Sequence, residues 1–286
     1  MAIKKNQHFP SMEHMTVKQV REYLQRKQSI IIPLGVIEQH GYHLPLNCDA
    51  LIAEHLSQRI GKKTDILVAP TMYSSFSGGG LSGTINISPA VMSLVISDML
   101  ISLVAQGFLN FYLFLCHGGS ENTHALNSAI KLLLRNNPAF EKVMIAILPV
   151  WKFDSRGIGW SKALKEKDWH AGWLETSIVM ALVPDLVQMD ELELDPEPLL
   201  SQQIEHPDNY QRAEKIVDDE LVVPRLTQRP EIKVGVMGHP ERASRELGIK
   251  IIEDIVNTAS VKILEIESKA DGKYKPVPFN PEPLIF

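Results

Sequence analysis

Apolar and polar positions along this chain form blocks with two different periods. Short apolar runs rich in β-branched residues predict buried strands at residues 29–34, 66–69, 110–116 and 143–150. Apolar positions at helical spacing predict helices at residues 16–27, 50–60, 89–106, 121–135, 175–182 and 248–266. Because strands and helices alternate, we expect an α/β fold with a mainly parallel sheet that is covered on both faces.

Chemically active side chains cluster directly after two of the predicted strands. Glu38, His40 and Asp49 follow the strand at 29–34, and His117 follows the strand at 110–116. The carboxyl ends of parallel strands meet at one edge of a sheet, where ligand sites form. We therefore expect these two loops to share one site.

Most of these residues also have a purely structural interpretation. Asp49 precedes a predicted helix and is a good N-cap residue. His117 at a strand end suits a hydrogen-bonded core histidine, and Glu121 at a helix start suits the positive end of the helix dipole. The apolar flanks of Glu38 and His40 favour a functional role for that pair.

A third cluster is the segment His-Ala-Gly-Trp-Leu-Glu at residues 170–175. His170 falls in a predicted loop, and Glu175 opens a predicted helix. An imidazole beside a carboxylate forms a general acid–base pair in many enzymes. The alternative is a surface histidine followed by a helix-capping glutamate.

Together these residues supply imidazole and carboxylate ligands. Mixed nitrogen and oxygen ligands favour Zn, Mn or Fe over Ca. The set suits two divalent metal ions bridged by one carboxylate, a pair that polarises a carbonyl and makes hydroxide at neutral pH. The spacing of the residues leaves open whether the loops converge.

Composition narrows the classes of function. The 286-residue chain has a formal net charge of −5 and a pI of about 6.1, which argues against a nucleic-acid partner. The N-terminal segment lacks the apolar run of a secretory signal, and the apolar stretches 29–37 and 108–116 are too short to cross a bilayer. Cys48 and Cys116 are the 2 cysteines, so a disulfide framework is not expected. We expect a cytoplasmic protein with no membrane partner.

Three segments resemble signatures of the creatininase (creatinine amidohydrolase) family and occur in that family's order. They are PLGVIEQHGYHLPLNCDALIAEHL at 33–56, HAGWLETSIVMAL at 170–182 and VGVMGHPERASRELG at 234–248. In the last segment, His239 stands where the family usually has Asp. The polar stretch around 190–233, which is punctuated by prolines, predicts an irregular excursion within a single domain, residues 1–286. The resemblance implies a three-layer α/β/α sandwich with a mainly parallel sheet. It also implies a homo-oligomer, often a hexamer.

The same resemblance implies a site for two divalent metal ions per chain. The ligands carry over to Glu38, His40, Asp49 and His117, with Asp49 bridging the ions. The fifth ligand falls on Glu121, and Glu175 is the rival for that place. His170 corresponds to the histidine that protonates the leaving nitrogen.

The implied reaction is attack of metal-activated water on a cyclic amide or a formamide, with cleavage of a C–N bond. Ser77 and Trp151 match substrate-binding segments, whereas Glu166 and Lys167 replace a Trp-Asp pair of creatininase. These departures argue against creatinine as the small-molecule substrate. Lys167 either favours an acidic substrate or is a solvated surface lysine. The alternatives are a peptide-trimming member of the family and a metal-binding subunit without catalysis.

Overall fold

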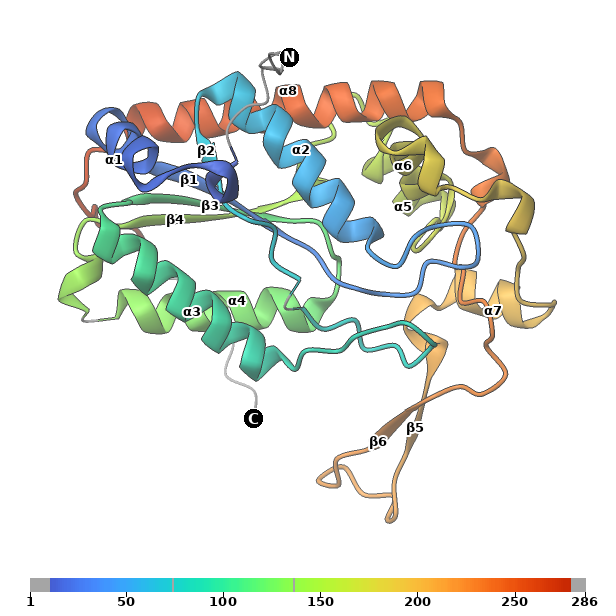
Figure 1. The fold of residues 1–286 in the computed structure, drawn as a ribbon. Coiled ribbons are helices and arrows are strands. Elements are labelled where there is room, and N and C mark those ends of the chain that lie inside the picture. The colour runs from blue at the N-terminus through green and yellow to red at the C-terminus, as the bar shows by residue number, and fades with distance from the viewer. Residues whose placement is uncertain (1–10, 74, 136, 279–286) are drawn as a thin grey trace.

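The centre of the molecule is a four-stranded parallel sheet (Figure 1). The computed structural model describes residues 11–73, 75–135 and 137–278. The strands are β1 (Ser29–Leu34), β2 (Leu67–Val68), β3 (Asn110–Leu115) and β4 (Met144–Pro149), in the order β2-β1-β3-β4. Each neighbouring pair runs parallel, so the expected parallel sheet is confirmed. Residues 1–10 of the segment predicted to lack a signal lie outside the described residues.

Helices cover both faces of this sheet. They are α1 (Val17–Arg26), α2 (Cys48–Thr64), α3 (Pro89–Gln106), α4 (Ser120–Leu134), α5 (Trp160–Glu166), α6 (Trp173–Leu182), α7 (Leu199–Glu205) and α8 (Arg245–Lys269). In Figure 1, α2, α6 and α8 lie above the sheet, and α3 and α4 lie below it. The three-layer α/β/α arrangement expected from the sequence is therefore confirmed.

Successive strand residues point to opposite faces, so each face of the sheet buries its own core. Ile31 and Phe114 belong to the core beneath α2, α6 and α8. Ile30 and Leu113 belong to the core that α3 and α4 cover. Because both faces are buried, β1 and β3 read in the sequence as continuous apolar runs.

The predicted helices and strands are present, with ends that differ by a few residues. The segment around 190–233, which the sequence predicts as irregular, contains α7 and an antiparallel hairpin. Short 3-10 helices connect the other elements, at Met12–His14, Pro138–Phe140, Val150–Lys152, Pro184–Leu186, Met189–Glu191, Pro207–Tyr210 and Pro240–Arg242.

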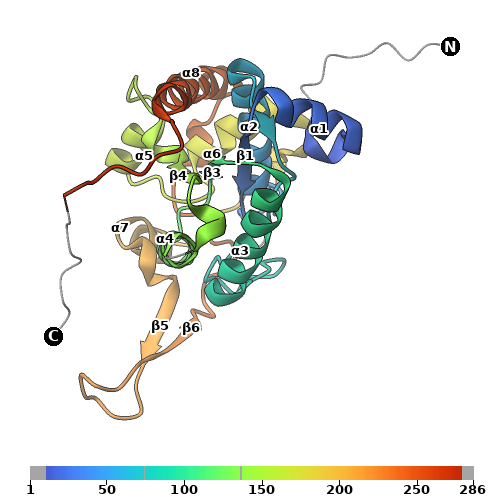
Figure 2. The same ribbon diagram turned by 90° about the vertical axis from the view of Figure 1, so that its left-hand side faces the viewer.

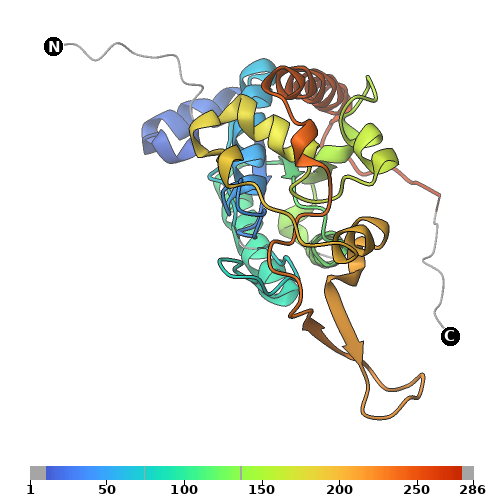
Figure 3. The same ribbon diagram turned by 90° about the vertical axis from the view of Figure 1, so that its right-hand side faces the viewer.

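The hairpin projects from the body of the molecule (Figures 2 and 3). It consists of β5 (Gln211–Glu214) and β6 (Arg225–Gln228), and we call residues 211–228 the arm. Its tip carries uncovered apolar side chains, with Ile216, Leu221 and Val223 exposed by 102%, 86% and 87%. Large exposed apolar side chains gathered on one element are typical of an interaction surface.

By length and composition, α3 is the one helix in the described ranges that could cross a membrane. The sequence pattern did not single it out as such. Its Met92, Ile96 and Leu100 are buried in the core below the sheet, and the helix packs along α4. These contacts give α3 the role of a covering helix of the sheet.

Candidate active site

The strand order creates a crevice at one edge of the sheet. From β1 the chain crosses to β2, which pairs with one edge of β1, and later to β3 and β4, which lie beyond the other edge of β1. The helices α2 and α3 cover opposite faces of the sheet. Such a reversal between β1 and β3 opens a crevice outside the carboxyl ends of the strands, where ligands bind. The loops after β1 and β3 flank this point, so the sheet itself brings their polar residues together.

Close packing at the end of β1 brings Asp49 to the crevice. A Cβ atom on Gly35 would lie 2.5 Å from the Cα of Ala50, so glycine allows the end of β1 to touch the first turn of α2. Asp49 lies in that turn. The N-cap of α2 is Asn47, so the capping alternative for Asp49 is wrong.

The buried carboxylate of Asp49 lies between two histidines. Its Oδ2 is 3.0 Å from Nδ1 of His117, and its Oδ1 is 3.7 Å from Nε2 of His40. On the first side, Oε2 of Glu38 lies 3.4 Å from the same Nδ1 of His117. On the second side, Oε2 of Glu175 lies 3.8 Å from Nε2 of His40. Each oxygen of Asp49 therefore faces a different group, as a bridging carboxylate requires.

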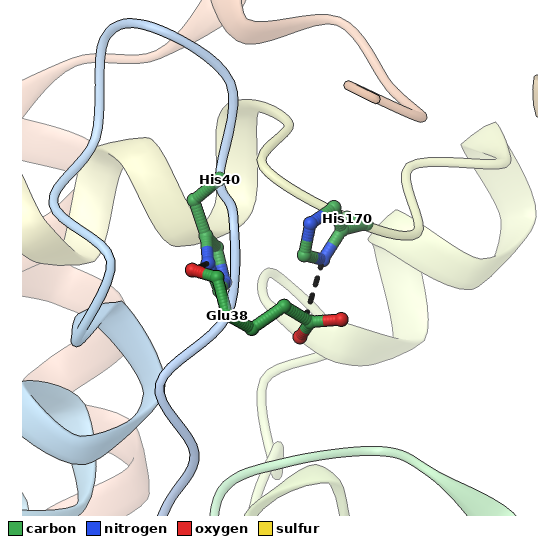
Figure 4. A group of neighbouring side chains, drawn as sticks. All are labelled: Glu38, His40 and His170. Atoms are coloured by element: carbon green, nitrogen blue, oxygen red, sulfur yellow. Dashed lines mark hydrogen bonds and ion pairs between the residues drawn. The ribbon is translucent and has the colours of Figure 1, made fainter. Parts of the chain in front are cut away.

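Potential ligand atoms lie within 4.8 Å of one another in three overlapping groups of described residues. The groups are Glu38, Asp49 and His117; His40, Asp49 and Glu175; and Glu38, His40 and His170. Figure 4 shows the third group, in which the rings of His40 and His170 and the carboxylate of Glu38 lie together although they come from two loops. The structure thus brings the four expected ligands, His170 and Glu175 to one place.

Glu121 lies apart from these groups. It is exposed in the first turn of α4, where its Oε2 accepts a hydrogen bond from Oγ of Ser120 at 3.1 Å. This position matches the helix-dipole alternative. Glu175, in the first turn of α6, has a side chain that is only 15% exposed, and its Oε2 accepts the backbone N–H of Ala171 at 2.7 Å.

The donor set fits divalent metal ions. Oε2 of Glu38 and Nε2 of His40, which both face this cluster, are buried and have no hydrogen-bond partner among the described residues. Native proteins leave few buried polar atoms unpaired. Carboxylate oxygens and imidazole nitrogens that converge without partners are the ligands that Zn and Mn take.

Opposite charges set the protonation of this cluster. Burial penalises the charged form of His117, but Glu38 and Asp49 outweigh that penalty and raise its pKa to about 9. Burial also opposes ionisation of Asp49, yet hydrogen bonds from His117 and His40 lower the pKa of that carboxyl. Burial raises the pKa of Glu175 to about 7. Without metal, protonated histidine therefore balances the buried carboxylates.

Two contacts with Gln39 hold the ring of His170. Its Nε2 lies 2.7 Å from the backbone oxygen of Gln39, an acceptor, and 3.0 Å from the side-chain Nε2 of the same residue, a donor. Its Nδ1 faces Oε2 of Glu38 at 4.0 Å. Burial lowers the pKa of His170, and the charge of His40 lowers it further. The imidazole is therefore neutral and can take up a proton.

Buried Asp168 holds the loop that carries His170, and the sequence pattern did not reveal it. Its carboxylate accepts backbone hydrogen bonds of 2.9–3.1 Å from Trp173, Leu174 and His239. A Cβ atom on Gly172 would lie 1.9 Å from Oδ1 of Asp168, so the carboxylate occupies the space that this glycine leaves. Asp168 thereby joins the start of α6 to the segment before α8.

Comparison with known proteins agrees with this geometry. Residues 13–263 match the family described as creatininase, creatinine amidohydrolase. The chain belongs to the creatininase family. Members of this family are amidohydrolases, so the prediction of a hydrolase is confirmed.

Relatives with different names align over most of the chain. Creatinine amidohydrolase of Pseudomonas putida is 26% identical over 256 residues, which covers 82% of this chain and 88% of the relative. Mycofactocin precursor peptide peptidase of Mycolicibacterium smegmatis is also 26% identical over 256 residues, covering 85% and 87%. A solved mutant creatininase described as the Zn-Zn type shares the fold, with a TM-score of 0.70, 23% identity and coverage of 90% and 98%.

A cavity of about 630 Å³ opens from the metal-ligand cluster of this creatininase-family protein. Ser77 and Trp151, the two residues expected to bind substrate, both line it. Oγ of Ser77 donates a hydrogen bond to Oε1 of Glu38 at 2.5 Å, so the loop that carries Ser77 touches the cluster directly. The aromatic lining consists of Trp151, Trp160, Trp169 and Tyr210.

Within the described residues, no lysine or arginine lines this cavity. Lys167 forms an ion pair with the exposed carboxylate of Glu205, as expected for a solvated lysine. Gln203 and Gln228, which also line the cavity, come from the segment predicted to be irregular. Their sequence neighbourhood carries no motif or periodicity that marks them as functional.

Proposed function

We propose that this protein is a dinuclear metal amidohydrolase that cleaves a C–N bond of an amide. The observation that carries the proposal is the position of Asp49, whose two oxygens face His117 and His40 separately. Two ligand groups that share one carboxylate are the arrangement that two bridged ions need. Family membership supports the same chemistry.

We assign the ligands from the groups described above. Glu38, Asp49 and His117 would hold one ion, and His40, Asp49 and Glu175 the other. The sequence hypothesis gave the fifth place to Glu121. We propose Glu175 instead, because its carboxylate lies 3.8 Å from His40, whereas Glu121 is exposed and outside the groups.

The residues around the ions support hydrolysis. Bound divalent ions would polarise the substrate carbonyl and lower the pKa of a water molecule. His170 takes a proton as the water oxygen bonds to the carbonyl carbon, and it gives that proton to the leaving nitrogen as the C–N bond breaks. The backbone of Gln39 and the carboxylate of Asp168 keep the imidazole oriented during this cycle. The products are a carboxylic acid and an amine.

The cavity supports a neutral substrate larger than creatinine. A volume of about 630 Å³ falls in the range of sites for drug-sized ligands. No cationic side chain from the described residues is present to pair with an acidic group. We therefore propose a cyclic amide or a formamide that carries a flat apolar portion.

A second candidate is a peptide-trimming activity. A relative that aligns over 85% of the chain is described as a peptide peptidase, and the cavity has room for more than one amino-acid side chain. Both candidates use the same ions and the same proton carrier. They differ in the compound that is turned over.

We further propose that copies of the chain assemble into a homo-oligomer. The support is the arm, whose apolar tip is left uncovered by the rest of the described residues. Covering Ile216, Leu221 and Val223 by another copy would remove this apolar surface from water.

Elemental analysis and amide turnover test the function. Protein dialysed against zinc or manganese should retain roughly two ions per chain. A panel of lactams, formamides and short peptides should yield at least one substrate, with release of amine. His170→Ala should lower kcat by roughly 100-fold or more while the metal content is unchanged.

The controls separate the alternatives. If the protein retains two ions and turns over no amide in the panel, the non-catalytic subunit is the better description. Loss of metal in His170→Ala would show that His170 is a ligand and would overturn its role as proton carrier. Turnover of short peptides alone would favour peptide trimming.

A further inference from the structure

One cavity-lining residue outside the metal-ligand groups has an unpaired, buried amide. Gln203, in α7, is only 1% exposed, and neither its Oε1 nor its Nε2 has a hydrogen-bond partner among the described residues. In Figure 1, α7 lies between α6 and the arm. Gln203 lines the same cavity as Glu38 and His117.

This lack of partners is unusual for a side chain with such bonding capacity. The amide offers two N–H donors and an acceptor oxygen. Buried amides are normally paired, because an unpaired one loses its hydrogen bonds to water without replacement. Of the described residues that line the cavity, the others with unpaired buried atoms are Glu38 and His117, which we assign to metal. The side-chain amide of Gln203 is therefore available to form hydrogen bonds with a ligand bound in the cavity.

A hydrogen bond and several aromatic side chains define the surroundings of Gln203. The indole Nε1 of Trp169 donates a hydrogen bond of 2.8 Å to the backbone oxygen of Ile204, the next residue of α7. Trp169 lines the cavity too, so one indole both holds α7 in place and forms a wall beside it. Trp160 and Tyr210 add further aromatic surface. A flat ligand would find stacking surfaces here and no cation among the described lining residues.

We propose that Gln203 binds the paired N–H and C=O edge of a flat, uncharged amide, such as a lactam, and so selects the substrate of this site. A primary amide presents an acceptor oxygen and a donor hydrogen on one edge, which complements a cyclic amide through two parallel hydrogen bonds. The proposal rests on the proposed function in one respect, that the cavity with the metal ligands is also the substrate cavity. It adds the recognised group and the residue that recognises it.

Direct binding of two matched compounds tests the proposal. The probes are 2-pyridone, a flat lactam, and 1-methyl-2-pyridone, which has the same ring and carbonyl but no N–H. Isothermal titration calorimetry with the zinc-loaded protein should give about tenfold tighter binding of 2-pyridone, the effect of a paired amide contact. Equal binding of the two compounds, or no saturable binding of 2-pyridone, would overturn the proposal. If Gln203 binds only an ordered water molecule, 2-pyridone should show no saturable binding.

Variants assign the preference to Gln203. Gln203→Met keeps the length of the side chain and removes its hydrogen bonds, so both probes should bind within about twofold of each other. Gln202→Leu is the matched control, because Gln202 is exposed on the same helix and should leave the preference intact. A preference that survives in Gln203→Met contradicts the assignment. Melting temperatures of both variants verify that they fold, and equal binding of the two probes to the wild-type protein would overturn the proposal even if a variant did not fold.

The result is separable from the proposed function. Selective pyridone binding without amide turnover by any compound would remove the hydrolase proposal and leave the amide subsite. Amide turnover without selective pyridone binding would support the hydrolase proposal and remove the amide subsite at Gln203.

Discussion

At the scale of residues, the bridging role proposed for Asp49 predicts how the metal content changes when this residue is replaced. Its two oxygens serve two groups, so Asp49→Asn should lower the metal content from roughly two ions per chain to less than one after dialysis. Glu175→Gln touches one group and should leave roughly one ion. Inductively coupled plasma mass spectrometry measures both.

Glu121→Gln is the control for this measurement. It is exposed and lies outside the ligand groups, so the variant should retain the wild-type metal content. Loss of an ion in Glu121→Gln, with the full metal content retained in Glu175→Gln, would show that Glu121 and not Glu175 is the fifth metal ligand.

The pKa of His117 predicts how metal binding depends on pH. A histidine must lose its proton to bind metal, and that of His117 titrates at about 9 in the metal-free protein. Zinc affinity should therefore rise by up to about tenfold per pH unit below pH 9 and level off above it. Calorimetry in buffers of different ionisation enthalpy should detect the released proton. An affinity that is flat from pH 7 to 9 would contradict this assignment.

The same pKa fixes the sign of a stability change. The pKa of His117 in the fold lies above its ordinary value of 6.5, so protonated His117 stabilises the metal-free protein fully below that value. This contribution is lost as the pH rises through 9. Differential scanning calorimetry of metal-free protein should show a falling Tm between pH 6.5 and 9, which bound zinc abolishes.

Site residues that directly follow a strand were predictable from the sequence. Site residues whose importance depends on their being buried were not. Glu38, His40 and His117 were predictable because apolar strand patterns end just before them, and parallel strands end together. Asp168 and Gln203 matter because they are buried against partners or a cavity. Burial of a polar residue in a loop or a short helix leaves no periodic pattern in the sequence.

At the scale of elements, the contact between α6 and α8 positions Glu175. A Cβ atom on Gly248 would lie 1.8 Å from the backbone oxygen of Ser177, so Gly248 of α8 touches α6 at a position two residues beyond Glu175. Gly248→Ala should force the helices apart and destabilise the protein by about 3 kcal/mol. Thermal unfolding should show a drop in Tm of roughly 6–10 °C.

A neighbouring substitution controls for helix propensity. Lys250 is exposed on α8, so Lys250→Ala should change stability by less than about 0.5 kcal/mol. An equal effect of the two substitutions would mean that α8 does not need close contact with α6.

Long helices were predictable, and the shortest helices were not. The 18-residue α3 has Ser88 as its cap and a left-handed Gly107 at its end, which are both visible in the sequence. The 7-residue helices α5 and α7 are too short to form on propensity alone. Tertiary contacts, such as the hydrogen bond from Trp169 to α7, hold them in place.

At the scale of the whole molecule, the arm predicts how copies associate. Replacing both Ile216 and Leu221 by Ser should lower the mass measured by light scattering, because the tip loses the apolar surface that another copy would cover. Metal content should not change. Asp218→Ala, at an exposed polar position of the same tip, is the control and should keep the wild-type mass. An unchanged mass in the double variant would remove the arm from the interface.

The root of the arm is tied to the wall of the metal site. Oε1 of Gln228 accepts the backbone N–H of Gly80 at 2.9 Å, and the amide of Gln211 donates to the oxygen of Gly78. The same glycine-rich loop begins at Ser77, which bonds Glu38. If copies associate through the arm as proposed, an arm seated on a neighbouring copy would steady the loop at its own active centre. Specific activity should then fall when the enzyme is diluted below the concentration at which copies separate. The catalytic rate per chain would therefore depend on the concentration of the protein.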